Sequence, residues 1–212
     1  MTTESLEAKL RRVEFPTLGH FLEKGFLPSP GIRAIAPGMT AVGRARTVRI
    51  PDADAAAVNR AILGLSAGDV LVIDMGDSDP HACVGAVTIA ALRAVGAAGV
   101  VVNGLVTDLD DLTAEHETAR RVPVFARGST SLTTKRRASG ASGYDVSLEI
   151  DGVIINPGDW VLGDRNGVLI ASDEALAGVI DAALDSDAAE PALLERIAAG
   201  ESLEGLLFTG RS

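Results

Sequence analysis

The sequence has one cysteine, three histidines and few aromatic residues. A single cysteine, Cys83, excludes an intrachain disulfide and is typical of a protein from a reducing compartment. The histidines, His20, His81 and His116, are too scattered to predict a closed zinc site. Because only 3% of the residues are aromatic, the core must consist mainly of Ala, Val, Leu and Ile.

Lysine is scarce as well. The lysines are Lys9, Lys24 and Lys135, and none ends an apolar strand, so Schiff-base chemistry is not expected. The formal net charge of -10 argues against partners such as nucleic acids and anionic membranes. The sequence shows no P-loop, no Ser-His-Asp arrangement, no apolar signal segment and no apolar run of membrane-spanning length. We therefore expect a cytoplasmic protein.

The residues that are present predict an α/β protein. Hydrophobic residues make up 47% of the 212 residues, which is enough for a sizeable core. No internal repeat or long linker appears, so we expect one domain over residues 1–212 with a mixed sheet, N-terminal helices over about 1–25 and a C-terminal helical tail over about 173–212. The patterns predict helices at 3–13, 18–23, 53–65, 85–96, 173–185 and 190–200, and strands at 41–50, 68–74, 97–103, 122–128 and within 146–172.

The strand at 68–74, the helix that begins near Gly85 and the strand through Asn103 form a βαβ unit, which predicts a right-handed parallel crossover. Ligands of open α/β sheets bind beyond the carboxyl ends of the strands. Asp74 to Cys83 follow the first strand, and Thr107 and Asp108 follow the second. We therefore expect the two loops to face one pocket, with the amides at the start of the helix available to a carboxylate.

The acidic residues after the second strand have two interpretations. In "VVVNGLVTDLDDL", Thr107 or Asp108 is a good helix N-cap, and Asp110 and Asp111 suit the first turn of a helix. Alternatively, Asp108 holds a hard cation through oxygen or water, as in a sparsely ligated magnesium site. Local sequence alone favours the capping interpretation for this segment.

Three further residues near these loops are candidates. His81 is a possible general acid or base, although an exposed loop histidine is the simpler interpretation. Cys83 is a possible nucleophile, but a lone cysteine among apolar residues is more often a packing residue. Asn103 either binds a ligand or helps to turn the chain at Asn103-Gly104.

Other cations and one tryptophan cannot be placed from sequence. Lys135, Arg136 and Arg137 form a basic run in a polar loop, which is either a solvated face or a contact to an anionic substrate. Arg44, Arg46 and Arg127 are possible sources of a cation in the pocket. Trp160, in the "PGDW" turn, is most simply a packing or interface residue. Asn166-Gly167 predicts a two-residue hairpin turn.

The ordered motifs together resemble a known family. "GDVLVIDMGD", "ACVGAVTIAALRAVGAAGVVVNGLVTDLDDL", "VPVFARG" and "INPGDWVLGDRNGVLIAS" are similar to the family named for the regulator of ribonuclease activity. That family includes 4-hydroxy-4-methyl-2-oxoglutarate aldolase and oxaloacetate decarboxylase. The likeness runs from about Ala36 to the tail, and weakly into the N-terminal helices.

The resemblance implies a swivelling β/β/α fold that forms trimers or dimers of trimers. It also implies a metal-dependent lyase that cleaves C–C bonds next to a pyruvate unit, with Mg²⁺ or Mn²⁺ as cofactor. In such enzymes helix-start amides hold the substrate carboxylate, and an acid from the neighbouring subunit contributes. The short tail "ESLEGLLF" has few local partners in the sequence, so we also expect it to dock on a neighbouring subunit.

The residues of this chain match the family's site in part. Gly85 matches the helix-opening glycine and Asp108 the second member of an Arg-Asp pair, but Ala86 replaces an Asp and Thr107 replaces the arginine. A threonine cannot clamp a carboxylate bidentately, as an arginine can. We expect Asp108 to hold the metal and to act in catalysis with Thr107 and His81, and Gly85, Ala86, Val87, Asn103 and Thr107 to bind substrate.

Three functions agree with these residues. The first is a divergent metal-dependent lyase that acts on a 2-oxo acid or a related small carboxylate. The second uses the same pocket for another reaction, such as that of an isomerase, hydratase or cyclase in a specialised pathway. The third is a non-catalytic regulator of a ribonuclease.

Overall fold

The computed structural model describes residues 4–28, 30–51, 54–76, 80–114, 121–135, 140 and 142–208. The chain divides into two compact units, Glu23–Asp173 and the terminal segments Met1–Leu22 with Glu174–Ser212. Among the described residues, no helix is both long and apolar enough to cross a membrane.

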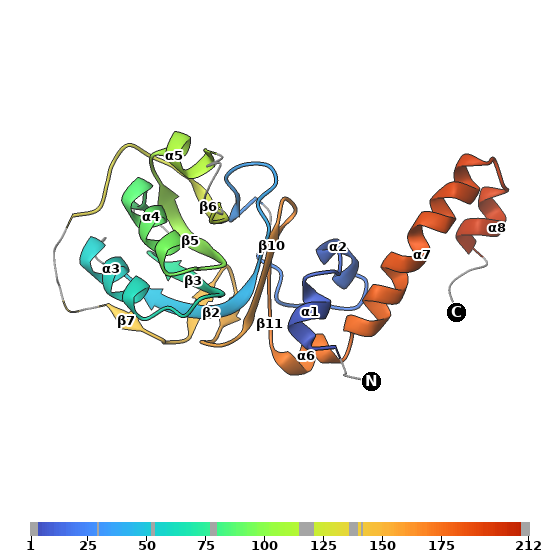
Figure 1. Cartoon of the computed structure of the whole chain (residues 1–212), viewed down its shortest axis with the longest axis horizontal. Helices are drawn as coiled ribbons and strands as arrows, with labels where there is room; N and C mark the ends of the chain where they lie inside the picture. Colours follow the sequence, from blue (N-terminus) through green and yellow to red (C-terminus); the bar gives the residue numbers. More distant parts are fainter. Residues whose placement is uncertain are drawn as a thin grey trace. The chain divides into compact units, whose positions relative to one another are not determined.

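A mixed sheet forms the centre of the Glu23–Asp173 unit (Figure 1). Its strand order is β1-β6-β5-β3-β2-β10-β11, with β4 paired to β5 and β7 paired to β2. The strands are β1 (Arg33–Ala34), β2 (Ala41–Arg49), β3 (Asp69–Asp74), β4 (Ala82–Val84), β5 (Gly99–Val106), β6 (Val124–Ser129), β7 (Gly143–Tyr144), β10 (Trp160–Asp164) and β11 (Gly167–Ala171).

Parallel strands occupy the middle of this sheet, and antiparallel strands lie toward its ends. β2, β3, β5 and β6 pair in parallel, whereas β1 and β10 pair antiparallel to β6 and β2. β1 and β11, at the two ends of the strand order, contact each other, so the sheet curves toward closure. The predicted mixed α/β sheet is confirmed, and so is the parallel pairing of β3 and β5, which sets Asp74 opposite Asn103.

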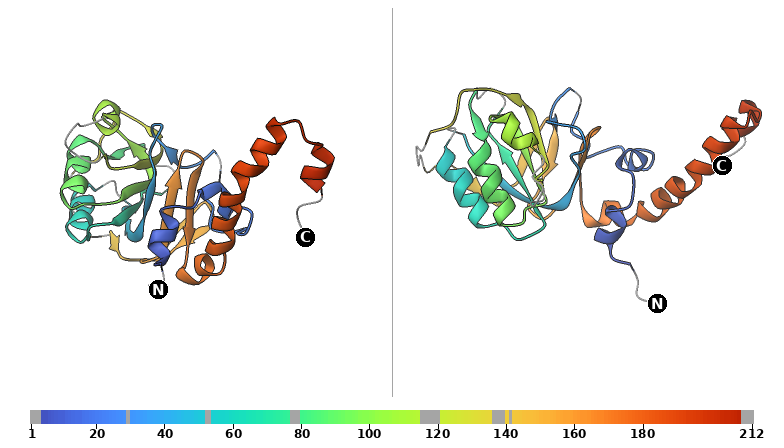
Figure 2. Two further views of the ribbon diagram at one scale, coloured as in Figure 1. Left: turned by 45° about the vertical axis from the view of Figure 1, so that its right-hand side comes forward. Right: turned by 45° about the horizontal axis from the view of Figure 1, so that its top comes forward.

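Helices cover one face of the sheet, as both views in Figure 2 show. They are α3 (Ala55–Leu63), α4 (Ala86–Ala94) and α5 (Leu109–Thr113). Buried aliphatic side chains such as Val72, Val101 and Ile89 fill the core, as the composition predicts. A separate hairpin, β8 (Leu148–Ile150) with β9 (Val153–Ile155), adds Leu148 and Ile155 to that core.

The terminal segments form a helical unit of their own. It contains α1 (Leu6–Leu10), α2 (Phe15–Leu18), α7 (Ile180–Ala198) and α8 (Leu203–Phe208), while α6 (Asp173–Ala177) starts at the last residue of the sheet unit. Asp187 of α7 accepts hydrogen bonds from the Glu14 backbone N–H and the Thr17 hydroxyl. These bonds tie the N-terminal helices to α7.

Several predicted boundaries were wrong. The second helix lies at Phe15–Leu18 rather than 18–23, because Pro16 in its first turn favours helix initiation there and Gly19 is the C-cap. The strand expected to end at Asn103 continues to Val106. Asn103-Gly104 is therefore not a turn. At Gly104 a Cβ atom would come within 2.9 Å of the Met75 sulfur, so glycine is needed there for close packing.

The C-terminal half also differs in detail. The helices predicted at 173–185 and 190–200 are divided at a different place. The short helix α6 ends at Ala177, and α7 runs from Ile180 to Ala198 through Pro191. The β10–β11 hairpin exists, but Asp164 pairs with Gly167, so Arg165 and Asn166 form its two-residue turn. The short strand β4 was not predicted at all.

Candidate functional site

A cavity of about 330 Å³ lies where α4 begins, at the carboxyl end of β5. The start of α3, β4, the first turn of α4, the residues after β5 and the loop after β6 contribute its walls. The lining residues are Ala55, Val58, Asn59, Ala82, Cys83, Val84, Gly85, Ala86, Val87, Thr88, Thr107, Asp108, Thr133 and Thr134. Residues that follow each of the two predicted strands, Ala82 and Cys83 after the first and Thr107 and Asp108 after the second, thus line one pocket, whereas Asp74 and Gly76 do not line it.

Asp108 lies at the centre of the site. It lies directly after Thr107, two residues beyond the end of β5, and adopts a left-handed conformation with φ 56° and ψ 46°. Its Oδ2 accepts a hydrogen bond of 3.0 Å from the Ala86 N–H, and its Oδ1 accepts one of 3.2 Å from the Thr107 hydroxyl. Asp108 occupies the N-cap position of α5, but its side chain makes no capping bond to that helix. The carboxylate instead caps the start of α4.

Gly85 makes this approach possible. A Cβ atom at this position would lie 2.5 Å from Asp108 Oδ2 and 2.8 Å from the Thr107 Cγ2. Any larger residue would therefore displace the carboxylate from the helix. The glycine at the start of α4 and the acid after β5 form one structural unit.

The next residues of the first turn of α4 line the same cavity. Ile89 N–H bonds to the Gly85 carbonyl, and Ala86 N–H is taken by Asp108. Val87 and Thr88, which both line the cavity, lie in the first turn, where a helix supplies no carbonyl for the N–H groups. These two N–H groups could donate to an anion in the cavity, whereas the Ala86 amide, predicted to bind substrate, already donates to Asp108.

Asp108 is the one charged side chain among the described residues that line the cavity. The other polar side chains are neutral: Thr88, Thr107, Thr133, Thr134 and Asn59. An anionic ligand at Val87 and Thr88 would meet the Asp108 carboxylate without a compensating cation from these residues. The site thus favours a carboxylate only when a positive charge accompanies it.

The donor set fits a hard, water-rich cation and not a cage built by the protein alone. Within the described ranges, no group of three or more His, Cys, Asp and Glu side chains could hold a metal. Asp108 uses two acceptor positions in the bonds to Ala86 and Thr107, and a carboxylate offers about four. Mg²⁺ commonly binds through one or two carboxylates and keeps several waters. Asp108 is therefore the residue that would hold such a cation.

Two predicted site residues lie outside this cavity. His81 does not line it. Asn103 is 1% exposed, and its amide group donates to Asp74 Oδ1 at 2.8 Å while its oxygen accepts from Arg127 Nε. Arg127 also donates to Asp151 at 2.8 Å. The Asn103 side chain therefore has a structural role, because its hydrogen bonds link β3, β5 and β6.

The other basic candidates also have different partners. Arg44 binds Asp173 and stacks 3.9 Å from the Trp160 ring centroid, and Arg46 forms two hydrogen bonds to Asp145. The basic run at 135–137 extends outside the described residues after Lys135, whose carbonyl accepts from the Ala55 N–H. Trp160 is 4% exposed, which agrees with a packing role.

The sequence did not single out the wall formed by α3 and the loop after β6. Thr133 and Thr134 lie in a polar loop beside the basic run, and their backbone joins β4 through the Thr134 N–H and the Ala82 carbonyl. Asn59 lies in a helix with ordinary amphipathic spacing, so no local signal marked it.

Comparison with known proteins decides the family. The model of the family described as RraA-like (Aldolase/RraA) matches residues 15–170, which is well over half of the chain. The chain belongs to the RraA-like family. The cavity therefore lies in a member whose Ala86 and Thr107 depart from the aldolase pattern that the resemblance implies.

Individual RraA-like relatives cover most of the chain. A Burkholderia mallei (strain SAVP1) protein named "Putative 4-hydroxy-4-methyl-2-oxoglutarate aldolase" is 35% identical over 175 residues, covering 82% of this chain and 97% of its own. An uncharacterized protein from Pseudomonas syringae pv. tomato has a TM-score of 0.80 and 26% identity, covering 98% of this chain and 95% of that one.

A third relative carries a regulatory name. Streptomyces coelicolor RraAS2, described as an unusual member of the RNase ES inhibitor RraA protein family, has a TM-score of 0.72 and 26% identity. It covers 88% of this chain and 93% of its own. These likenesses confirm the predicted fold class of this RraA-like protein.

Proposed function

We propose that this RraA-like protein is a divergent lyase that cleaves a C–C bond next to the pyruvate unit of a small 2-oxo acid. The observation that carries the proposal is the placement of Asp108 against the first turn of α4, next to Val87 and Thr88, which line the same cavity. The aldolase names of relatives such as the Burkholderia mallei protein support it.

In this proposal the chain's own residues bind and orient the substrate. The N–H groups of Val87 and Thr88 hold the substrate carboxylate at the positive end of α4. Asp108 and water hold Mg²⁺ or Mn²⁺, which when bound supplies the positive charge that polarises the 2-oxo group. Gly85 keeps Asp108 at that position, because no side chain separates the carboxylate from the helix.

Thr107 contacts the substrate where the family's aldolases have an arginine. Its hydroxyl donates to Asp108 in the structure, so it is positioned at the reacting end of the cavity. A neutral hydroxyl stabilises developing negative charge less well than a guanidinium does, and we expect slow turnover for that reason. The sequence suggested His81 as a general acid or base, but His81 does not line the cavity. In this proposal, water bound at Asp108 transfers the proton instead.

Pyruvate release tests the proposal. Oxaloacetate and 4-hydroxy-4-methyl-2-oxoglutarate are incubated with the protein, with Mg²⁺ or with EDTA, and the rate without protein is subtracted at each metal concentration. We expect metal-dependent release that falls about a hundredfold in Asp108→Asn and is unchanged in Asp164→Asn, a carboxylate that bonds within the β10–β11 turn. Equal rates with and without protein would refute the lyase function.

A second function is favoured by the two departures at Ala86 and Thr107 and by the name of the Streptomyces coelicolor relative. A non-catalytic regulator would need neither the missing arginine nor the missing acid. Adding the protein to a purified RNase E-type ribonuclease and measuring RNA cleavage tests it. Inhibition that persists in Asp108→Asn, together with no pyruvate release, would favour the regulator over the lyase.

A further inference from the structure

A second pocket of about 190 Å³ lies on the Glu23–Asp173 unit, apart from the residues that line the first cavity. It is formed by β2, β3, α3 and the β7 end. Its lining residues are Arg46, Thr47, Arg60, Ala61, Gly64, Leu71, Tyr144 and Asp145. No residue lines both pockets, although α3 contributes to each of them.

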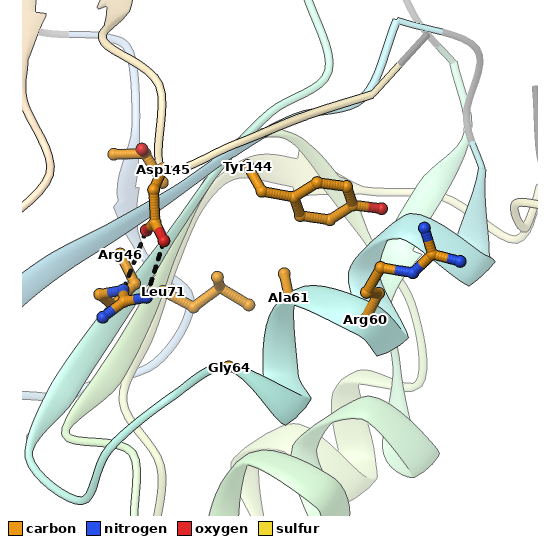
Figure 3. Close-up of a pocket in the computed structure, with 8 residues that line it drawn as sticks. Arg46, Arg60, Ala61, Gly64, Leu71, Tyr144 and Asp145 are labelled. Carbon is orange, nitrogen blue, oxygen red and sulfur yellow. Dashed lines mark hydrogen bonds and ion pairs between the residues drawn. The ribbon is translucent and has the colours of Figure 1, made fainter. Parts of the chain in front are cut away.

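The pocket has a flat apolar middle. The Tyr144 ring lies opposite Ala61 of α3, and Leu71, which is 1% exposed, lies beside them toward Arg46 and Asp145 (Figure 3). Gly64 adds no side chain to the lower wall. A slot between an aromatic ring and aliphatic groups suits a planar ring, because such a ring gains contact on both of its faces.

Charged groups lie at the two ends of this slot. At one end Arg46 binds Asp145 through hydrogen bonds of 2.9 and 2.7 Å, so these two charges compensate each other (Figure 3). At the other end the Arg60 guanidinium lies 5.9 Å from the Tyr144 ring centroid. No carboxylate among the described residues pairs with Arg60.

The pocket therefore carries an excess positive charge in a protein whose formal net charge is -10. Arg60 is exposed, and its ion-pairing capacity remains available to a ligand. A guanidinium beside an aromatic face binds a carboxylate attached to a flat ring, since the charge and the stacking surface then act on the same molecule.

We propose that this pocket is a binding site for a small aromatic carboxylate. The ring lies between Tyr144 and Ala61, and the carboxylate binds Arg60. The Arg46–Asp145 pair closes the other end, where its two charges compensate each other and leave no free cation for a second anionic group. This site is separate from the cavity at Asp108, so it does not depend on the lyase function.

Titration of the 212-residue chain with benzoate tests the site. Binding is measured by calorimetry and by changes in the amide NMR signals of Thr47, Ala61 and Gly64. We expect saturable binding in the millimolar range. Benzyl alcohol, which lacks the charge, and cyclohexanecarboxylate, which lacks the flat ring, bind more weakly. Arg60→Gln raises the dissociation constant about tenfold, whereas Arg165→Gln, an exposed arginine in the β10–β11 turn, leaves it unchanged.

A second variant separates a folding defect from a loss of contact. Tyr144→Leu, checked for native circular dichroism, removes the preference for benzoate over cyclohexanecarboxylate. Asp108→Asn leaves benzoate binding unchanged. The site is refuted if benzoate shows no saturable binding, if Arg60→Gln binds it as tightly as the wild type, or if Asp108→Asn abolishes the binding, which would place the ligand in the first cavity.

Discussion

Asp108 shows how one residue can have a local and a distant role. By its position in the chain it precedes α5, and local sequence favours a capping function there. Its left-handed backbone turns the side chain toward α4 instead, where it accepts the Ala86 N–H. The sequence suggested that Asp108 caps α5. The partner of its carboxylate depends instead on the parallel pairing of β4 with β5, which brings the start of α4 next to Asp108.

Gly85→Ala tests the close approach of Asp108 to α4. The new methyl group overlaps Asp108 Oδ2 and Thr107, and we expect the free energy of unfolding to fall by about 1–3 kcal/mol. Urea denaturation measures it. Gly178→Ala is the control, since a Cβ atom there would meet its nearest neighbour at 3.5 Å. Equal stabilities for the two variants would contradict this role of Gly85.

Asn103→Leu tests whether Asn103 is structural. The substitution removes a hydrogen bond to Asp74, which is 8% exposed, and one from Arg127, so we expect a loss of about 2–4 kcal/mol in urea denaturation. Asn166→Leu, which removes a bond on an exposed turn, costs less than about 1 kcal/mol. A stable Asn103→Leu protein with altered substrate affinity would instead indicate a ligand contact.

Asp173 gives a prediction about pH. Hydrogen bonds from Arg44, and then from Trp160, lower the pKa of the Asp173 carboxyl from its ordinary value of 3.8, although desolvation opposes them. Because the folded pKa is depressed, the stabilisation is present above pH 3.8 and is lost as the pH falls through the folded pKa.

The Asp173 side chain is 63% exposed, so solvent screening limits its contribution to less than about 1 kcal/mol. We expect Asp173→Asn to be less stable than the wild type at pH 6 and equally stable once the carboxyl is protonated. Urea denaturation over this pH range measures the difference. A difference that does not change with pH would show that the ion pair with Arg44 contributes nothing.

At the scale of elements, periodicity predicted the strands and helices of the βαβ unit well. β3, α4 and the start of β5 lie close to where the pattern placed them, because buried aliphatic runs and a helix-opening glycine are local signals. β4 was missed because three residues carry no periodicity. The cavity wall from Thr133 and Thr134 was missed since it depends on their backbone joining β4, a contact between distant segments.

Pro191 is an element-scale exception. It lies inside the 19-residue helix α7, where it cannot donate to the carbonyl of Asp187. We expect Pro191→Ala to stabilise the helical unit by about 1–3 kcal/mol, measured by thermal unfolding with far-ultraviolet circular dichroism. Glu190→Ala, at the adjacent exposed position, changes stability by less than about 0.5 kcal/mol. A destabilised Pro191→Ala protein would show that the proline is needed for packing.

At the scale of the whole molecule, the described lining of the cavity contains one charged side chain. Asp108 is the single carboxylate in the described lining, and the family resemblance implies an acid from a neighbouring subunit. The trimer or dimer of trimers stays a prediction. It matters for the site because a neighbouring subunit would supply that acid. Exposed apolar residues of α8, among them Leu203 and Phe208, are the expected contacts of the tail with such a neighbour.

The central claim is that a small carboxylate binds the first turn of α4 with a cation held at Asp108. Oxalate, which resembles the enolate of pyruvate, is titrated into the labelled protein with Mg²⁺ and with EDTA, and the amide NMR signals of Val87 and Thr88 are followed. We predict saturable shifts of both signals with Mg²⁺, and none with EDTA or in Asp108→Asn. Unchanged Val87 and Thr88 signals in the wild type with Mg²⁺ would contradict the claim.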